Sequence, residues 1–182
     1  MAGERSNAVL SPKPSIQARS DFIANYGGIY EHSPWVAEAV WENGVGESQD
    51  TADGLADAMA EVVEKAPVER QLALIRAHPD LAGKTAVAGD LTVDSASEQA
   101  SAGLQQCSVE EFERFQRFNA EYKARFGFPF VMAVRGQTRH AILEAFERRL
   151  RHGRDEERRE AIVQINRIAR LRLYERVATQ SF

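Results

Sequence analysis

Apolar residues recur at helical spacing in nearly every segment of this chain, and breaker residues separate one segment from the next. Side chains three and four positions apart share one face of a helix, so this spacing favours amphipathic helices. No pair of segments shows the alternation typical of a half-buried strand. Breakers and caps set the expected helices at about 16–26, 33–43, 51–66, 67–77, 95–106, 108–127, 138–153 and 155–177. The sequence therefore predicts an all-α fold of seven or eight helices.

Residues that can cap a helix N-terminus precede most of these segments. Their side-chain oxygens accept hydrogen bonds from the unpaired N–H groups of the first turn. Two starts, Ser95 with Glu98 and Ser108 with Glu111, match the capping box S-x-x-E. The other expected caps are Ser33, Thr51 or Asp53, Thr138 and Asp155.

One apolar stretch, Phe128–Val134, has no helical period and contains Pro129. We expect it to run extended through the core, where its backbone N–H and C=O groups need partners. Residues 1–15 mix Ser, Pro and Lys without a period, which predicts a flexible arm. Residues 16–182 are long enough to bury one continuous core and are expected to form a single domain.

Composition excludes several classes of protein. A net charge of −4 argues against nucleic-acid binding through bulk positive charge, and the Arg-rich run 148–159 alternates with acids, as on a solvated helical face. No apolar run approaches the ~20 residues of a membrane span, and no signal core is present, so we expect a cytoplasmic protein with no membrane partner. The only cysteine, Cys107, cannot form an internal disulfide and is interpreted as structural.

Polar residues converge at the ends of two neighbouring helices. His78 precedes Pro79, and a residue before proline is pushed out of helical geometry, so this imidazole should stand at a helix exit. After a loop, the next helix opens with Ser95, Glu98 and Gln99. An imidazole and a carboxylate facing one cavity favour acid/base catalysis. Three arginines could bind an anionic substrate in bidentate fashion: Arg135, Arg170 and Arg172.

Simpler interpretations remain open for each of these residues. His78 can serve as a partner of the helix dipole, Asp80 as a turn residue, and Ser95 with Glu98 as a cap. The chain has no paired metal-ligand spacing, nucleophile elbow, phosphate loop or dinucleotide fingerprint. Chemistry without a metal or cofactor is therefore expected. A hydrolase of a ureido compound and a non-enzymatic partner-binding module stay as alternatives.

Several blocks along the chain carry a resemblance to a known family. They are YGGIYEHSPWVAE (26–38), RAHPDLAGK (76–84), LTVDSASEQASAGL (91–104), NAEYKARFGFPFVMAVRG (119–136) and QINRIARLRL (164–173). Together they resemble the OHCU decarboxylases of urate catabolism, which convert 2-oxo-4-hydroxy-4-carboxy-5-ureidoimidazoline to (S)-allantoin and CO2. The resemblance implies an all-α, cofactor-independent carboxy-lyase that commonly forms homodimers.

The resemblance also implies a set of site residues. The catalytic histidine of the family corresponds to His78, and Glu98 is expected to assist it. Arg172 matches the substrate arginine better than Arg170 does. The full set of implied substrate-binding residues is Pro79, Ser95, Ala96, Ser97, Glu98, Gln99, Phe130, Val131, Met132, Ala133, Val134 and Arg172.

Overall fold

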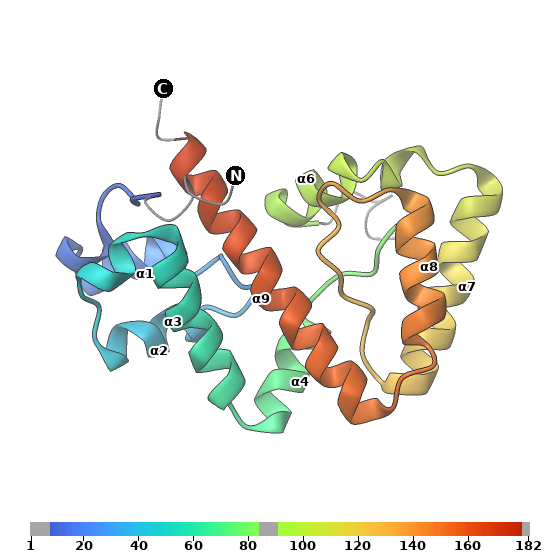
Figure 1. The fold of residues 1–182 in the computed structure, drawn as a ribbon, viewed down its shortest axis with the longest axis horizontal. Helices are drawn as coiled ribbons and strands as arrows, with labels where there is room; N and C mark the ends of the chain where they lie inside the picture. The colour runs from blue at the N-terminus through green and yellow to red at the C-terminus, as the bar shows by residue number, and fades with distance from the viewer. Residues whose placement is uncertain (1–7, 84–90, 180–182) are drawn as a thin grey trace, which may run out of the picture. The chain divides into compact units, whose positions relative to one another are not determined.

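The structure, a computed structural model, describes residues 8–83 and 91–179, and nearly all of its regular structure is helical (Figure 1). Its α-helices are α1 (Arg19–Tyr26), α2 (Trp35–Asn43), α3 (Ala52–Lys65), α4 (Val68–Arg76), α6 (Val93–Ser101), α7 (Val109–Phe126), α8 (Arg139–Arg149) and α9 (Arg154–Thr179). Short 3₁₀ helices are η1 (Pro14–Ile16), η2 (Glu47–Asp50) and η3 (Leu104–Gln106). Among the described residues the only β pairing is an isolated bridge between Val9 and Thr51. The predicted all-α fold is confirmed.

Three of the expected caps are present with the hydrogen bonds that define them. The Thr51 hydroxyl accepts from Gly54 N at 3.0 Å, and the Thr138 hydroxyl accepts from Ala141 N at 3.1 Å. Ser108 and Glu111 form a reciprocal capping box, with N···O distances of 2.9 and 3.1 Å. Each bond satisfies an N–H group that the first turn leaves unpaired.

Three other expected caps are wrong. Thr92, not Ser95, caps α6, because the Thr92 hydroxyl accepts from Ser95 N at 3.3 Å and places Ser95 inside the first turn. The Ser33 hydroxyl donates to Glu31 O at 2.8 Å instead of capping α2. Asp155 lies within the first turn of α9, and Gly153 N donates to the carboxylate of Glu156 at 3.2 Å.

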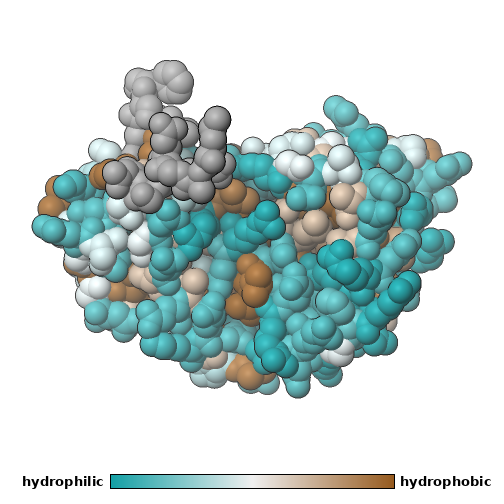
Figure 2. Space-filling model, viewed as in Figure 1, coloured by the Kyte–Doolittle hydropathy of each residue, from teal (hydrophilic) through white to brown (hydrophobic). Residues whose placement is uncertain are grey.

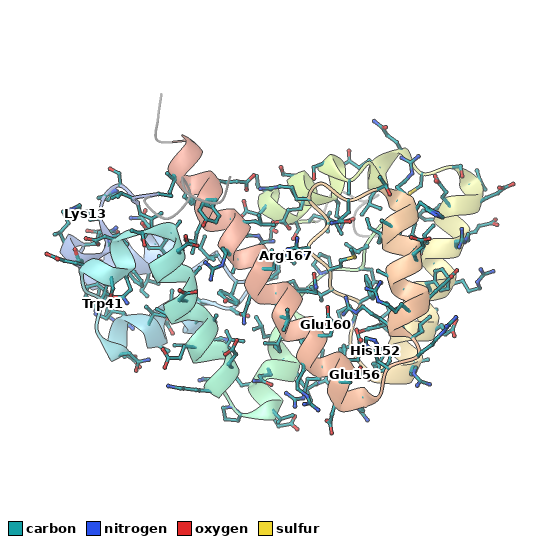
Figure 3. The ribbon with its side chains drawn as sticks, in the orientation of Figure 1. Lys13, Trp41, His152, Glu156, Glu160 and Arg167 are labelled. Carbon is teal, nitrogen blue, oxygen red and sulfur yellow. The ribbon has the colours of Figure 1, made fainter. Side chains whose placement is uncertain are left out.

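The chain divides into two compact units: unit 1 comprises residues 1–74 and 166–182, and unit 2 comprises residues 75–165. In unit 1, α1 packs on α2 through the rings of Phe22 and Trp41 (labelled in Figure 3), whose centroids lie 5.4 Å apart. The buried face of α3 carries the apolar stripe that its sequence predicted, with Leu55 and Met59 fully buried. Whether residues 16–182 behave as one domain stays a prediction.

The start of the described chain is packed on unit 1. Leu10 is fully buried, and its N–H donates to Asp50 O at 2.8 Å. Both the backbone N–H and the hydroxyl of Ser15 donate to the Asp50 carboxylate, at 2.9 and 2.8 Å. The flexible arm expected over residues 1–15 is therefore not what residues 8–15 form, because one buried leucine and one carboxylate hold them. Residues 1–7 lie outside the described residues.

Unit 2 has an aromatic core between α7 and α8. Phe118 of α7 stacks on Phe146 of α8 with centroids 5.6 Å apart, and Phe115 meets the same ring edge-on at 6.2 Å. Phe130, from the extended stretch, stacks on Phe146 at 3.7 Å. The expected extended stretch therefore exists, and its rings belong to the same core as the two helices.

The exposed surface is mostly hydrophilic on the face drawn in Figure 2, with apolar residues scattered over it. Among the residues that the structure describes, the large exposed apolar side chains are single aliphatic residues from separate positions: Val9, Ile16, Val68, Val93, Val109 and Val163. Within the described ranges, no helix has the length and apolar character needed to cross a bilayer.

Candidate active site

His78 lies just beyond the end of α4, as the His-Pro step predicted. The helix ends at Arg76, and His78 N donates to Ile75 O at 3.1 Å, which closes the last turn. The His78 residue is 8% exposed, and Pro79 after it is half-buried. The imidazole therefore belongs to a residue that lies at a helix exit and is largely shielded from bulk water.

The turn that follows His78 is tied to two helices by side-chain amides. Gln99 of α6 makes a double contact: its Nε2 donates to Asp80 O at 3.2 Å, and its Oε1 accepts from Ala82 N at 3.0 Å. From α7, Asn119 Nδ2 donates to Leu81 O at 2.9 Å and Gln116 Nε2 donates to Ala82 O at 2.8 Å. Three consecutive residues of the turn thus have backbone groups bonded to helical side chains.

The face of α6 that carries Ser95, Glu98 and Gln99 looks toward this turn. These residues are spaced i, i+3, i+4, so they share one face of the helix, and Ser95 and Gln99 are buried while Glu98 is half-buried. Gln99 contacts the turn directly, and Ser95, one helical turn earlier, is buried on the same side of α6. Ala96 is half-buried and Ser97 is exposed, so Ser97 points away from that face.

Two residues of this arrangement, Gln116 and Asn119, were missed by the sequence analysis. They lie on α7, whose aromatic spacing marked it only as scaffold. A signal was nevertheless present: Asn119 is four residues after Phe115 and three before Tyr122, so it occupies the apolar face of the helix. A polar side chain on a buried face must find a partner, and at 3% exposure Asn119 found the carbonyl of Leu81.

The extended stretch receives its hydrogen-bond partners from α8 and α9. Arg149 Nη1 donates to Val131 O at 2.7 Å, and Ala133 N donates to Gln164 Oε1 at 3.1 Å. The Arg149 guanidinium also lies 4.3 Å from the centroid of the Phe130 ring. Of the implied substrate-binding residues here, Phe130, Val131, Ala133 and Val134 are buried and Met132 is half-buried.

A buried ionic network stands behind this stretch. Arg149 is 1% exposed and Glu157 0% exposed, and Arg149 Nε donates to Glu157 Oε1 at 2.7 Å. The Tyr122 hydroxyl donates to the same oxygen, and Nδ1 of His152 (labelled in Figure 3) lies 2.8 Å from the other. The solvated face expected over residues 148–159 is therefore wrong for Arg149 and Glu157, because residues on either side of the break at Gly153 pair inside the core.

In unit 1, Arg172 is buried and paired. It is 3% exposed, its Nη1 lies 3.0 Å from Glu31 Oε2, and the same nitrogen donates to Ile29 O at 3.2 Å. Arg170, the alternative, is more exposed and is held by the carboxylates of Asp53 and Asp57. Burial lowers the pKa of Arg170, but hydrogen bonds to these two carboxylates raise it overall. Both arginines are therefore paired with carboxylates, Arg170 near the surface and Arg172 in the interior of unit 1.

Cys107 borders a cavity of about 580 Å³ in unit 2 that Ala82, Gln99, Leu104 and Phe112 also line. Burial, and then the neighbouring Glu111 carboxylate, raises the pKa of the Cys107 thiol. A raised thiol pKa disfavours the reactive thiolate, in keeping with a structural cysteine. In the parts of the chain that the structure describes, no group of three or more His, Cys, Asp or Glu side chains is arranged to hold a metal ion.

The described residues define an all-α protein in which a buried histidine, a carboxylate-bearing helix face and an amide-tethered turn belong to one compact unit. Sequence comparison makes the assignment specific. The chain belongs to the OHCU decarboxylase family, whose profile matches residues 16–174. The resemblance is confirmed, and the chain is an enzyme of the carboxy-lyase class.

Named relatives match most of the chain. A 2-oxo-4-hydroxy-4-carboxy-5-ureidoimidazoline decarboxylase of Haloferax volcanii is 46% identical over 159 residues, which is 87% of this chain and 90% of the relative. A protein of the same name from Mus musculus is 35% identical over 164 residues, covering 88% of this chain and 89% of the relative.

Two solved structures share the fold. A crystal structure of (S)-allantoin synthase is 32% identical with a TM-score of 0.71, and the match covers 90% of this chain but 52% of that one. The chain thus spans about half the length of that protein. A crystal structure of OHCU decarboxylase in the presence of (S)-allantoin is 22% identical with a TM-score of 0.63, and it covers 79% of this chain and 91% of that one. At that identity it supports the fold alone.

Proposed function

We propose that this chain decarboxylates 2-oxo-4-hydroxy-4-carboxy-5-ureidoimidazoline, releasing CO2 and forming (S)-allantoin, with His78 as the acid/base and without a metal or organic cofactor. The observation that carries the proposal is the placement of His78: buried, just outside a helix, and followed by a turn that Gln99 binds to α6, the helix that also bears Glu98. Family membership and the names of the relatives support the substrate.

The reaction follows from the chemistry of the substrate. One ring carbon carries both a carboxylate and a hydroxyl. When its bond to the carboxylate breaks, CO2 leaves and the electron pair enters the adjacent unsaturated system, so no external electron sink is needed. A proton must then reach that carbon. His78 exchanges a proton with the hydroxyl or with the developing carbanion, and delivery to one face gives a single enantiomer.

The other residues hold the substrate. Glu98, as an ionised carboxylate, is acceptor-only and either orients the imidazole or accepts from the ureido N–H groups. Arg172 binds the anionic edge of the substrate, and backbone groups of the stretch 130–134 bind its ring and ureido arm. Ser95, Pro79 and Ala96 complete the proposed binding set, whereas the exposed Ser97 lies outside it. Gln99 enters mainly by fixing the turn, since both ends of its amide bond the backbone at Asp80 and Ala82.

The decisive experiment is incubation with freshly generated substrate, followed by ultraviolet decay and by circular dichroism of the product. Catalysis gives (S)-allantoin, whereas spontaneous decay gives a racemate. His78→Ala should reduce turnover by about 10²–10⁴-fold and leave the melting temperature within a few degrees. His140→Ala is the matched control, because His140 is exposed on α8. Near-full enantioselective activity in His78→Ala would overturn the assignment, and hydrolysis without CO2 release would favour the ureido hydrolase.

Two further variants separate binding from folding. Glu98→Gln should lose activity with little change in stability, because Thr92 and not Glu98 completes the cap of α6. Arg172→Lys should raise KM, since a point charge does not replace a bidentate fork. Arg170→Lys, at the surface ion pair, should leave KM unchanged. A raised KM in Arg170→Lys alone would transfer the substrate role to Arg170.

The same proposal includes assembly and location. We expect a homodimer, as the family resemblance implies, and we expect it to be located in the cytoplasm. Light scattering of the purified protein tests the first expectation, and fractionation of the source cells tests the second. A mass of one chain at micromolar concentration would contradict the dimer.

A further inference from the structure

The turn that follows His78 is bonded to one face of α7. Gln116 and Asn119 are three residues apart on that helix, and each donates an amide N–H to a consecutive carbonyl, Ala82 O at 2.8 Å and Leu81 O at 2.9 Å. We propose that Asn119 and Gln116 are positioning residues that hold His78 in its catalytic geometry. The inference rests on the proposed function, because it assumes that His78 is the acid/base.

The turn needs such support because its own conformation is unfavourable. Ala82 has a φ of 48°, a left-handed conformation that a residue with a Cβ adopts only when its surroundings impose it. At Gly83, a Cβ would lie 2.7 Å from Asp80 Cβ, so the chain passes unusually close to itself. Residues 79–83 lie outside the helices, and residues 81 and 82 form a turn. Bonds from outside the turn therefore help to keep it in place.

α7 is a suitable anchor for these bonds. The capping box of Ser108 and Glu111 fixes its N-terminus, and Phe115 and Tyr122, on either side of Asn119, are fully buried. Asn119 itself is 3% exposed, so the bond to Leu81 O is not exchanged with water. A turn bonded to this helix is therefore held in a fixed position relative to the core of unit 2.

The distance along the chain from His78 to the anchored carbonyls is short. Only Pro79 and Asp80 separate His78 from Leu81, and the ring of Pro79 fixes its φ. A shift of the turn would therefore displace the imidazole by a similar distance. Misplacement of a catalytic group by about 1 Å costs on the order of 10²-fold in rate. The expected effect of releasing the turn falls on kcat and not on substrate affinity.

The test compares three variants on one helix. Asn119→Leu and Gln116→Met remove the donors at similar volume. Lys123→Met is the matched control, because Lys123 binds the Asp80 carboxylate, at 2.7 Å, rather than the backbone of the turn. We expect kcat to fall about 10–100-fold in Asn119→Leu and less in Gln116→Met, with KM changed by less than about threefold. Lys123→Met should keep kcat within about twofold.

A double-variant cycle distinguishes positioning from general destabilisation. If Asn119 acts through His78, adding Asn119→Leu to His78→Ala should reduce the residual rate by less than about threefold. The imidazole NMR signals of His78, assigned by their absence in His78→Ala, should shift or broaden in Asn119→Leu while those of His140 stay fixed. If Asn119→Leu fails to fold, the half-buried Gln116→Met is judged by the same cycle and spectra.

The outcomes are separable. Two outcomes would overturn the inference but leave the proposed function intact. One is that Asn119→Leu lowers the rate equally in the wild-type and His78→Ala backgrounds. The other is that both amide variants keep the wild-type kcat and unchanged His78 signals. An inactive wild-type protein, or full activity in His78→Ala, would instead overturn the proposed function on which it rests.

Discussion

Two stretches of non-helical backbone in unit 2 are held by different chemistry. The turn after His78 is bonded by the neutral amides of Gln99, Gln116 and Asn119. The stretch Phe128–Val134 is bonded by the neutral amide of Gln164 and by the cation of Arg149. Both stretches would otherwise leave buried peptide groups unpaired, which costs free energy.

The difference lies in what each donor requires around it. An amide can be buried once its own hydrogen bonds are made, whereas a guanidinium also needs a counter-charge. Glu157 supplies that charge, and Tyr122 and His152 bond its oxygens in turn. The extended stretch therefore depends on the counter-charge that Glu157 supplies to Arg149, while the backbone of the turn is bonded by neutral side chains in direct contact with it. Four predictions test this contrast.

Glu157→Gln should have the largest effect. It removes the counter-charge of a buried cation and should lower the free energy of unfolding by about 3–5 kcal/mol. Glu156→Gln, one residue earlier and exposed, should change it by less than about 0.5 kcal/mol. Chemical denaturation of the two variants measures both values. Equal stabilities would mean that the ionic network is not required.

Gln164→Leu should have a smaller effect on the same stretch. Ala133 N would lose its partner, at a cost of about 1–3 kcal/mol. No counter-charge is left unpaired, so the loss should stay below that of Glu157→Gln. Urea denaturation measures the free energy of unfolding of both variants. A larger loss in Gln164→Leu than in Glu157→Gln would contradict the distinction between neutral and charged donors.

The pH dependence of stability should report on the network. Burial, with a smaller contribution from Glu157, raises the pKa of Tyr122 above its usual value of 10.0. The unfolded chain can then ionise Tyr122 near pH 10 while the folded protein cannot, so stability is fully present below that pH and falls above it. The slope attributable to one tyrosine is about 1.4 kcal/mol per pH unit. Tyr122→Phe should flatten the curve between pH 10 and 11; an unchanged slope would show that other groups dominate there.

Lys123→Gln should have the smallest effect. The ion pair to Asp80 is partly exposed, with side-chain exposures of 47% and 25%. Pairs of this kind contribute about 0–1 kcal/mol, and salt screens them. Thermal unfolding at low and high ionic strength measures the contribution. A loss as large as that of Gln164→Leu would mean that the turn also relies on charge.

The sequence predicted the helices well because each one carries its own periodicity and breakers. It placed His78 correctly because the constraint imposed by Pro79 is local. It misplaced the start of α6 because Thr92 and Ser95 both offer a hydroxyl at capping distance from a later residue, and only the structure shows which one is used.

The residues that hold the site were harder to predict because their partners are distant in sequence. Asn119 bonds a carbonyl 38 positions away, and Gln116 bonds one 34 positions away. Arg149 and Glu157 belong to a run dominated by exposed charges, and composition alone does not show that this pair turns inward. Local pattern gives the elements, whereas such pairings depend on the tertiary fold.

Three contacts near the N-terminus affect where the chain can be cut for expression. They are the bridge between Val9 and Thr51 and the hydrogen bonds of Leu10 and Ser15 to Asp50. The family match begins at residue 16, so a protein trimmed to that boundary would lose all three. It would leave the apolar site of Leu10 empty and exposed, and it would remove the Ser15 donors that bind the Asp50 carboxylate. Such a truncated protein should aggregate and be poorly soluble, for reasons unrelated to catalysis.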